Sequence, residues 1–333
     1  MIEFFFEYGM FLAKTLTILV VIAVLVLFLL ATSSRKQSGR KDTLEIKPLN
    51  KKYHDMAMAL NMNMLQKDEL KKYLKQEKGK EKEKQKEAEK RKRIFVLNFY
   101  GDIRASAVSS LREEITALLT VATEKDEVFV RLESGGGTVN GYGLGASQLM
   151  RVRDKNILLT VSVDKVAASG GYMMACVGSR ILAAPFAIIG SIGVIAQIPN
   201  FNKVLKKHDI DYEQFTAGEF KRTVTMFGEN TEDAKAKFHE EIEDIHVLFK
   251  DFIVKHRPDI DIVKVSTGES WPGTRALDKH LVDELKTSDD YLLENSQSAD
   301  IYELSYVARK PLMERIGFQF QRLMDKVRYD RLT

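Results

Sequence analysis

A serine in a glycine-rich turn is the first candidate for chemistry in this sequence of 333 residues. Ser169 stands in A-A-S-G-G-Y (167–172), directly after an apolar run. A strand-to-helix turn of this kind leaves the hydroxyl accessible and points the first helical N–H groups at whatever the serine attacks. The hydroxyl still needs a base to remove its proton. Taken alone, a serine at such a position is more often a helix cap than a nucleophile, so the turn leaves both interpretations open.

Histidine is the usual base for a serine, but none of the histidines lies in a glycine-rich loop at the end of a predicted strand. They are His54, His208, His239, His246, His256 and His280. His54 belongs to a charged N-terminal segment, and three others fall in one long predicted helix (231–256). The sequence therefore does not support a Ser-His-Asp triad.

Lysine is the other base known to activate a serine, and the candidate is Lys221 in T-A-G-E-F-K-R (216–222). A lysine works as a base only when its pKa falls from about 10.4 toward 7–8, which burial away from carboxylates can achieve. Gly218 permits a tight turn there, and Phe220 offers an apolar wall. The composition also fits a solvated surface lysine, so a Ser169–Lys221 dyad is a hypothesis at this point.

Short apolar runs alternate with helical segments from Ile94 onward, and this alternation must position the candidate residues. The predicted strands are 94–100, 128–133, 157–163 and 180–185, and the predicted helices are 108–121, 138–154 and 231–256. Strands that alternate with helices indicate an α/β fold with a mostly parallel sheet. Glycine clusters follow the second and third strands, so both are expected at the carboxyl edge, where such sheets place their sites.

Two further segments are interpreted by length and charge. The apolar segment 186–197 has only 12 residues, too few to cross a bilayer, and a buried strand–turn–strand is predicted. The C-terminal stretch 311–331 has the pattern of a basic amphipathic helix, expected to serve as an oligomer arm or a membrane-surface contact.

Composition excludes several classes of function. The net charge of +4 is concentrated in residues 35–93, which hold 20 Lys and Arg against 10 Asp and Glu, so a basic enzyme surface for nucleic acid is not expected. The single cysteine, Cys176, excludes an intrachain disulfide and any metal site built from several cysteines.

An N-terminal membrane anchor is predicted. Residues 16–31 carry no charge, and with residues 11–13 the apolar stretch is long enough for about 30 Å of hydrocarbon. A cleaved signal peptide is the alternative, but the apolar run is long, its leading end is acidic and no A-x-A site follows. Arg35, Lys36, Arg40 and Lys41 follow the span and place the chain beyond it in the cytoplasm by the positive-inside rule.

The segment between the anchor and the first strand is expected to be a tether. It contains a Met-rich stretch (56–65), typical of a short amphipathic helix, and a Lys/Glu tract (67–93), typical of a solvated helix. The expected organisation of the chain is an anchor at 1–34, a charged linker at 35–93, a catalytic domain at 94–295 and a C-terminal strand and helix at 296–333.

Five segments in order resemble the signal peptide peptidase A family of membrane serine peptidases, and the chain looks most like the SohB type within that family. The segments are VRLESGGGTVNGYGL (130–144), DKVAASGGYMMACVGSRILAAP (164–185), IIGSIGVIAQ (188–197), TAGEFKR (216–222) and ALDKHLVDEL (276–285). The resemblance extends over residues 94–290. It implies a ClpP/crotonase-like α/β fold of repeated ββα units with an N-terminal transmembrane helix.

The resemblance also implies roles for individual residues. Ser169 would be the nucleophile and Lys221 the general base of a serine endopeptidase. The N–H groups of Gly136 and Gly170 would form the oxyanion hole, and Ser191 would orient the lysine amine. No cofactor and no metal is implied.

The partners implied by the resemblance are extended peptides, such as cleaved signal peptides, together with membrane lipid and further copies of the chain. Members of the family build their sites where protomers meet, so a homo-oligomeric ring is expected. The family also favours an inner-membrane protein whose domain faces the periplasm, which conflicts with the flanking charges.

The sequence departs from the family pattern at two positions. Gly135 replaces the proline of S-P-G-G, which makes the loop less pre-organised and predicts a modest loss of activity. His280 replaces the usual glycine before L-V-D-E, a matter of local turn geometry. A catalytically weak or inactive scaffold of the same fold is therefore one alternative, and an acyl-CoA hydratase or isomerase of the crotonase type is another.

Overall fold

The computed structural model describes residues 2–37, 43–87, 91–218 and 220–307 of the chain. Residues Leu44–Tyr306 form one compact unit, and the N-terminal helix belongs to a separate unit. The predicted C-terminal helix at 311–331 lies outside the described residues.

The N-terminal helix, α1, spans Ile2–Gln37. Its stretch Glu7–Leu25 has a mean hydropathy of 2.1 and none of its residues is buried. By length and composition α1 could therefore cross a membrane, in agreement with the apolar segment identified in the sequence.

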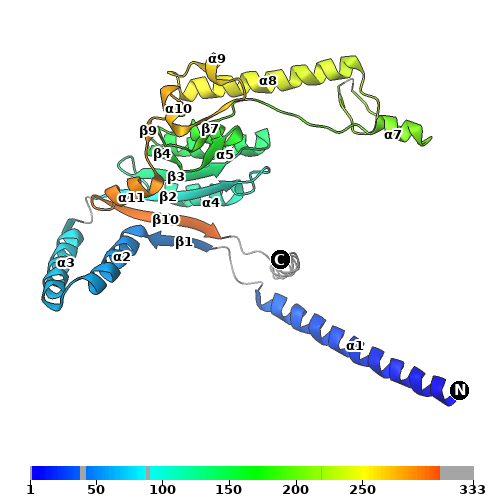
Figure 1. The fold of residues 1–333 in the computed structure, drawn as a ribbon, viewed down its shortest axis with the longest axis horizontal. Helices are drawn as coiled ribbons and strands as arrows, with labels where there is room; N and C mark the ends of the chain where they lie inside the picture. Colours follow the sequence, from blue (N-terminus) through cyan, green and yellow to red (C-terminus); the bar gives the residue numbers. More distant parts are fainter. Residues whose placement is uncertain (1, 38–42, 88–90, 219, 308–333) are drawn as a thin grey trace. The chain divides into compact units, whose positions relative to one another are not determined.

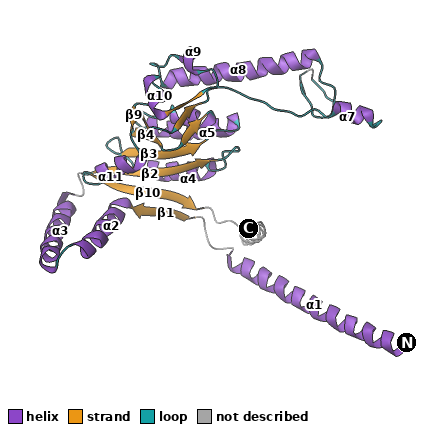
Figure 2. Cartoon of the chain, in the orientation of Figure 1, coloured by secondary structure: helices purple, strands orange, loops and turns teal. Residues whose placement is uncertain are grey.

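A ten-stranded sheet forms the centre of the compact unit. Its main path runs β1-β10-β2-β3-β4-β6-β9, and a branch of β5, β7 and β8 leaves from β3 (Figures 1 and 2). The strands are β1 (Thr43–Pro48), β2 (Lys92–Gly101), β3 (Glu127–Ser134), β4 (Leu158–Val163), β5 (Val166–Ala168), β6 (Arg180–Ala183), β7 (Ile188–Gly190), β8 (Ser270–Pro272), β9 (Glu284–Leu285) and β10 (Ala299–Val307). The pairs from β10 through β9, and those of β5, are parallel, and β7–β8 is antiparallel. This is the α/β fold with ββα units that the sequence predicted.

Helices cover both faces of the sheet (Figure 2). The described residues after α1 form the helices α2 (Leu49–Met64), α3 (Lys67–Glu87), α4 (Val108–Leu119), α5 (Val139–Arg153), α6 (Gly170–Ala175), α7 (Asn202–Lys207), α8 (Glu232–His256), α9 (Ile262–Val265), α10 (Gly273–Asp278) and α11 (Ser288–Asn295), of which α3 and α7 add no residue to the core. The helix predicted at 231–256 is α8, and the Thr231 hydroxyl caps its start by accepting the N–H of Ala234 at 3.2 Å.

Alternating side chains of β2 divide the core into two clusters. Phe95, Leu97 and Phe99 pack with α4 and α5 in the larger cluster, while Ile94 and Val96 join the smaller cluster on the opposite face. Successive residues of a strand point to opposite faces, so a strand covered on both sides must be apolar throughout. This explains why residues 94–97 and Phe99 are apolar and buried, while Asn98 and the exposed Tyr100 interrupt the run.

The linker and the C-terminal strand contribute to the same unit. The Met-rich stretch lies in α2, apart from Leu65, and the Lys/Glu tract is helical over Lys67–Glu87, whereas its last residues, Lys92 and Arg93, belong to β2. Leu49 at the start of α2 is buried in the smaller cluster. β10 pairs with β2 in parallel and lies inside the sheet path. The compact unit therefore runs from 44 to 306, whereas the expected boundaries of the catalytic domain were 94 and 295.

The prediction of a strand–turn–strand at 186–197 is wrong in its second half. Only Ile188–Gly190 is a strand, and its antiparallel partner is β8 rather than the residues that follow it. After Gly190 the chain still bonds to the β8 side, because Ser191 N–H donates to the Glu269 carbonyl at 2.6 Å and Gly268 N–H donates to Ile192 at 3.1 Å. The apolar run could not reveal that its partner lies about 80 residues further along the chain.

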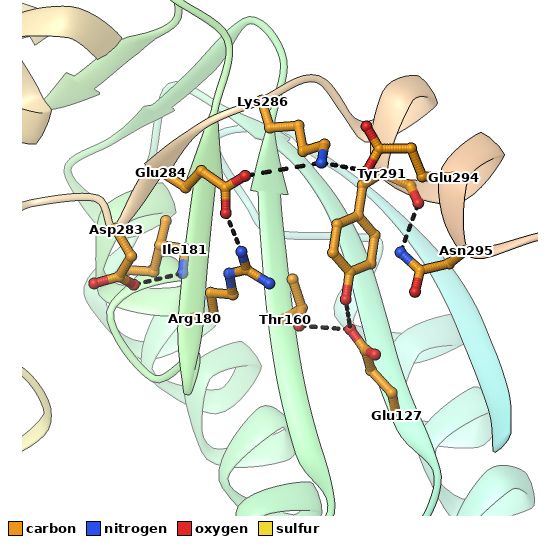
Figure 3. A network of polar contacts seen from close by, with 10 residues as sticks. All are labelled: Glu127, Thr160, Arg180, Ile181, Asp283, Glu284, Lys286, Tyr291, Glu294 and Asn295. Atoms are coloured by element: carbon orange, nitrogen blue, oxygen red, sulfur yellow. Dashed lines mark hydrogen bonds and ion pairs between the residues drawn. The ribbon is translucent and has the colours of Figure 1, made fainter. Parts of the chain in front are cut away.

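A polar network fixes the C-terminal elements to the amino ends of the strands (Figure 3). The buried Glu127 accepts hydrogen bonds from Thr160 at 2.6 Å and from Tyr291 at 2.7 Å. Arg180 pairs with Glu284 of β9, and Lys286 pairs with Glu284 and with Glu294 of α11 (Figure 3). Because these strands are parallel, their carboxyl ends lie at the other edge of the sheet, away from this network.

We expect His280→Gly to raise the free energy of unfolding by about 0.5–1 kcal/mol, because His280 has a positive φ of 59° that costs a side-chain-bearing residue strain. Its side chain is exposed, so little packing is lost. The same substitution at exposed His239 within α8 should lower stability by about 1 kcal/mol, since glycine is a poor helix residue. Urea unfolding of the full chain measures both, and two changes of the same sign would contradict the explanation.

Candidate active site

Ser169 occupies a strained turn between β5 and α6. Its backbone has φ 53° and ψ −120°, a conformation that costs a non-glycine residue about 1–3 kcal/mol. Two hydrogen bonds hold it: Ser169 N–H donates to Gly190 O at 2.8 Å, and its carbonyl accepts Met173 N–H at 3.0 Å. The side chain is half-buried. A strained residue that its surroundings over-determine is a frequent feature of active sites.

Two residues next to this turn, Gly136 and Gly170, must lack side chains. A Cβ on Gly170 would lie 2.5 Å from Cγ of the Tyr142 ring, and a Cβ on Gly136 would lie 2.8 Å from the Ser169 Cβ and from the Gly170 nitrogen. Gly136 also has a positive φ of 88°. The structure therefore places Gly136, Ser169 and Gly170 next to one another, and the close packing explains why two of them are glycine.

The N–H of Gly136 is already used within the loop. It donates to the Ser134 hydroxyl at 3.0 Å. The next residue, Gly137, lines the pocket beside Ser169 and Gly170. Gly137 also lies tightly against the 101–106 loop, because a Cβ there would come within 2.1 Å of the Ile103 carbonyl oxygen.

Gly137 is thus a candidate oxyanion donor that the sequence did not single out. Three consecutive glycines, 135–137, offered no local signal for choosing between their N–H groups. The role predicted for Gly136 stays a prediction, and its donor position is taken by Ser134 in this structure.

Ser191 lies beside the nucleophile turn. β5 and β7 pair in parallel with Ala168 opposite Gly190, so Ser169 and Ser191 follow paired residues. Ser191 is half-buried and has a positive φ of 48°. The ring of Trp271 packs against Gly190, because a Cβ there would lie 2.9 Å from the ring. Trp271 is therefore a packing residue, and it supports Gly190, whose carbonyl accepts the Ser169 N–H.

Lys221 is not brought to Ser169 within one chain. It is exposed, in a turn where its N–H donates to Gly218 O at 3.2 Å. The neighbouring Phe220 ring contacts the Lys237 amine, 5.3 Å from its centroid, on α8. α8 reaches the pocket of Ser169 only at Ile245, about 12 Å further along the helix. Figure 1 shows the segment between β7 and α8, with α7, drawn out from the sheet.

A small pocket of about 70 Å³ opens beside Ser169, with a mostly apolar wall. Its lining consists of Gly137, Val139, Ser169, Gly170, Met173, Gly193, Val194, Ile195, Ile245 and Phe249. No histidine, carboxylate or lysine is among these described residues. Among the described residues, the pocket therefore combines a serine, two glycines beside it and an apolar wall, without a side chain that could act as a base.

Models of known families match nearly the whole described chain. The model "Peptidase family S49 N-terminal" matches residues 3–149, and the model "Peptidase family S49" matches residues 151–302. The second model contains Ser169, Gly170, Ser191 and Lys221.

Curated relatives agree over almost their full length. The "Probable protease SohB" of Haemophilus influenzae is 49% identical over 324 residues, which is 94% of this chain and 92% of the relative. The protein of the same name from Buchnera aphidicola subsp. Acyrthosiphon pisum is 48% identical over 309 residues, 93% of this chain and 92% of the relative. Both family models and both relatives lead to one conclusion: the chain belongs to peptidase family S49, among its SohB-type members.

Proposed function

We propose that this chain is a serine endopeptidase of the bacterial inner membrane, anchored through α1, with Ser169 as nucleophile and Lys221 of a neighbouring copy as general base. The N–H groups of Gly170 and Gly137 bind the oxyanion, and Ser191 orients the lysine amine. The substrates are signal peptides or other extended envelope polypeptides.

The observation that carries this proposal is the geometry at Ser169. A serine with φ 53°, fixed at the start of α6, borders the same pocket as Gly137 and Gly170. None of the hydrogen bonds of the described residues uses the Gly137 or Gly170 N–H. Preorganised N–H donors next to a nucleophile stabilise the charge that develops on a carbonyl oxygen during acyl transfer.

The reaction follows from these positions. The Ser169 oxygen attacks the scissile carbonyl carbon while the neutral lysine amine takes the hydroxyl proton. The lysine returns this proton to the leaving amine as the peptide bond breaks, which leaves an acyl-serine. Water then attacks the acyl-serine by the same route and releases the second product together with the free enzyme.

A second copy of the chain is proposed as the source of the lysine because the segment that carries Lys221 has uncovered apolar side chains. Phe215 is 90% exposed, Ile195 78% and Phe220 54%. An exposed apolar surface of this kind is typical of an interaction site. A contact in which the segment of one copy covers the pocket of the next is head-to-tail, and such contacts form a ring when the rotation between copies closes.

The pocket favours an extended peptide with a small or apolar side chain. Val194, Ile195, Ile245 and Phe249 form its wall, and no charged residue of the described chain lines it. Apolar walls reward burial of apolar surface, while charged side chains would lose hydration there. The cleavage segments of signal peptides have this character.

We expect Ser169→Ala to abolish labelling by a fluorophosphonate probe and to lower peptide hydrolysis by at least about a thousandfold, because the nucleophile is removed. Ser147→Ala is the matched control, since Ser147 is an exposed serine of α5 whose hydroxyl bonds only the Gly143 carbonyl. Labelling and hydrolysis that survive in Ser169→Ala would reject the peptidase proposal and favour an inactive scaffold.

We expect Ser169→Ala and Lys221→Ala to complement each other when they are co-expressed. Each variant alone is inactive, but random head-to-tail assembly restores about a quarter of the sites, each with an intact serine from one copy and an intact lysine from the next. Hydrolysis per chain, compared with wild type, measures the recovery. A mixture as inactive as its components would show that the dyad does not form between copies.

We expect Gly135→Pro to raise kcat by a few fold and stability by about 0.4–1 kcal/mol, because proline restricts the loop before Gly136. A Cβ at Gly135 meets no atom within 4 Å, and its N–H donates none of the hydrogen bonds of the described residues. Gly143→Pro is the control, since a Cβ there is equally free but the residue lies within α5, where proline should cost about 3 kcal/mol. A lower kcat in Gly135→Pro would contradict this expectation.

A further inference from the structure

A chain of buried hydrogen bonds runs beneath the glycine loop. Gly136 N–H donates to the Ser134 hydroxyl at 3.0 Å, the Ser134 hydroxyl is bonded to the Tyr142 hydroxyl, and Tyr142 bonds the Asp102 carbonyl at 2.7 Å. Ser134 and Tyr142 are 2% and 0% exposed. The chain therefore connects the loop next to Ser169 with the end of β2 through two side chains that water does not reach.

The direction of every bond in this chain is determined by its end groups. A carbonyl oxygen can only accept, so the Tyr142 proton points to Asp102. The Ser134 proton must then go to the Tyr142 oxygen, and the Ser134 oxygen accepts from Gly136. Burial raises the pKa of Tyr142, which keeps the phenol protonated. This hydrogen-bond chain therefore has a single arrangement of its protons. Loss of either hydroxyl leaves buried polar groups without hydrogen-bond partners.

Further hydrogen bonds hold Asp102, at the far end of this hydrogen-bond chain. The Asp102 carboxylate accepts the N–H and the hydroxyl of Ser106, both at 2.8 Å, and these bonds hold the pKa of Asp102 below its usual value. The Tyr142 ring also packs directly on Gly170, on the other side of the nucleophile turn. Tyr142 thus contacts Gly170 directly and is linked to the Gly136 N–H through the Ser134 hydroxyl.

We propose that Ser134 and Tyr142 are positioning residues, which fix the Gly136–Gly137 loop and Gly170 at the spacing that the oxyanion requires. The proposal rests on the peptidase function proposed above. By occupying the Gly136 N–H, Ser134 turns the next amide, that of Gly137, toward the pocket. Neither hydroxyl touches the substrate, so both act through the backbone alone.

The test measures kcat and KM of Tyr142→Phe, Ser134→Ala and the double variant in the full-length protein with a fluorogenic peptide. Each single variant is expected to lower kcat by about 10–100-fold with KM changed by less than about twofold, because a displaced donor weakens only transition-state binding. The kcat of the double variant is expected to be no lower than that of the less active single variant, since both hydroxyls belong to one hydrogen-bond chain. Should Tyr142→Phe fail to fold, Ser134→Ala alone decides.

Tyr291→Phe is the matched control. It removes the same atom from another buried tyrosine, whose hydroxyl bonds Glu127 at 2.7 Å in the network at the amino ends of the strands (Figure 3). Its kcat is expected to equal that of wild type. An unchanged kcat in both chain variants, an equal loss in the control, or a loss confined to KM overturns the positioning role.

Amide hydrogen exchange separates this proposal from the proposed function. If the wild type shows no Ser169-dependent hydrolysis, the proposed peptidase function is wrong. Amide hydrogen exchange at residues 134–138 still tests whether the hydrogen-bond chain holds the loop. Faster exchange in Ser134→Ala and Tyr142→Phe than in Tyr291→Phe supports the fixed loop. Identical exchange in all three variants overturns it.

Discussion

The strained backbone at Ser169 is the constraint on which the rest of the site depends. A residue held at φ 53° and ψ −120° costs about 1–3 kcal/mol, and it persists only where neighbouring structure leaves no alternative. The β5–β7 ladder supplies the Gly190 carbonyl, and the first turn of α6 supplies the Met173 N–H. Glycines at 136 and 170 let the two backbones approach, because any Cβ there would collide with the turn.

The two ends of the parallel strands differ in character: the amino ends carry a stabilising polar network, and the carboxyl ends carry the candidate site. At the amino ends, Glu127, Tyr291 and Arg180 join the C-terminal elements to the strands through ion pairs and hydrogen bonds (Figure 3). At the carboxyl ends, the residues near Ser169 and Gly137 are small, and the pocket keeps an apolar wall. The buried Glu127 carboxylate has hydrogen-bond partners in Thr160 and Tyr291, so the first edge is well ordered, while the second edge holds the strained turn at Ser169.

Much of the fold follows from local patterns in the sequence. The alternation of apolar runs with helical segments predicted β2, β3 and β4 and the helices between them to within a few residues. The turn at Ser169 and its glycine neighbours were also predicted, because small residues and glycines directly after an apolar run indicate a tight strand-to-helix turn. What local patterns could not give were partners distant in the chain, such as β8 for the segment after Ile188, and β10 beside β2.

The sequence by itself determined the residue types of the chemistry: a serine in a tight turn, a lysine in a second glycine-containing turn, and three adjacent glycines. Only the tertiary structure decided which groups meet. In the structure the Gly136 N–H donates to the Ser134 hydroxyl, and Gly137 lines the pocket. Lys221 is exposed, and its neighbour Phe220 contacts Lys237 in the early part of α8. The physical reason is that side-chain identity and backbone periodicity are local properties, whereas a hydrogen-bond partner or a pocket wall depends on packing between segments far apart in the chain.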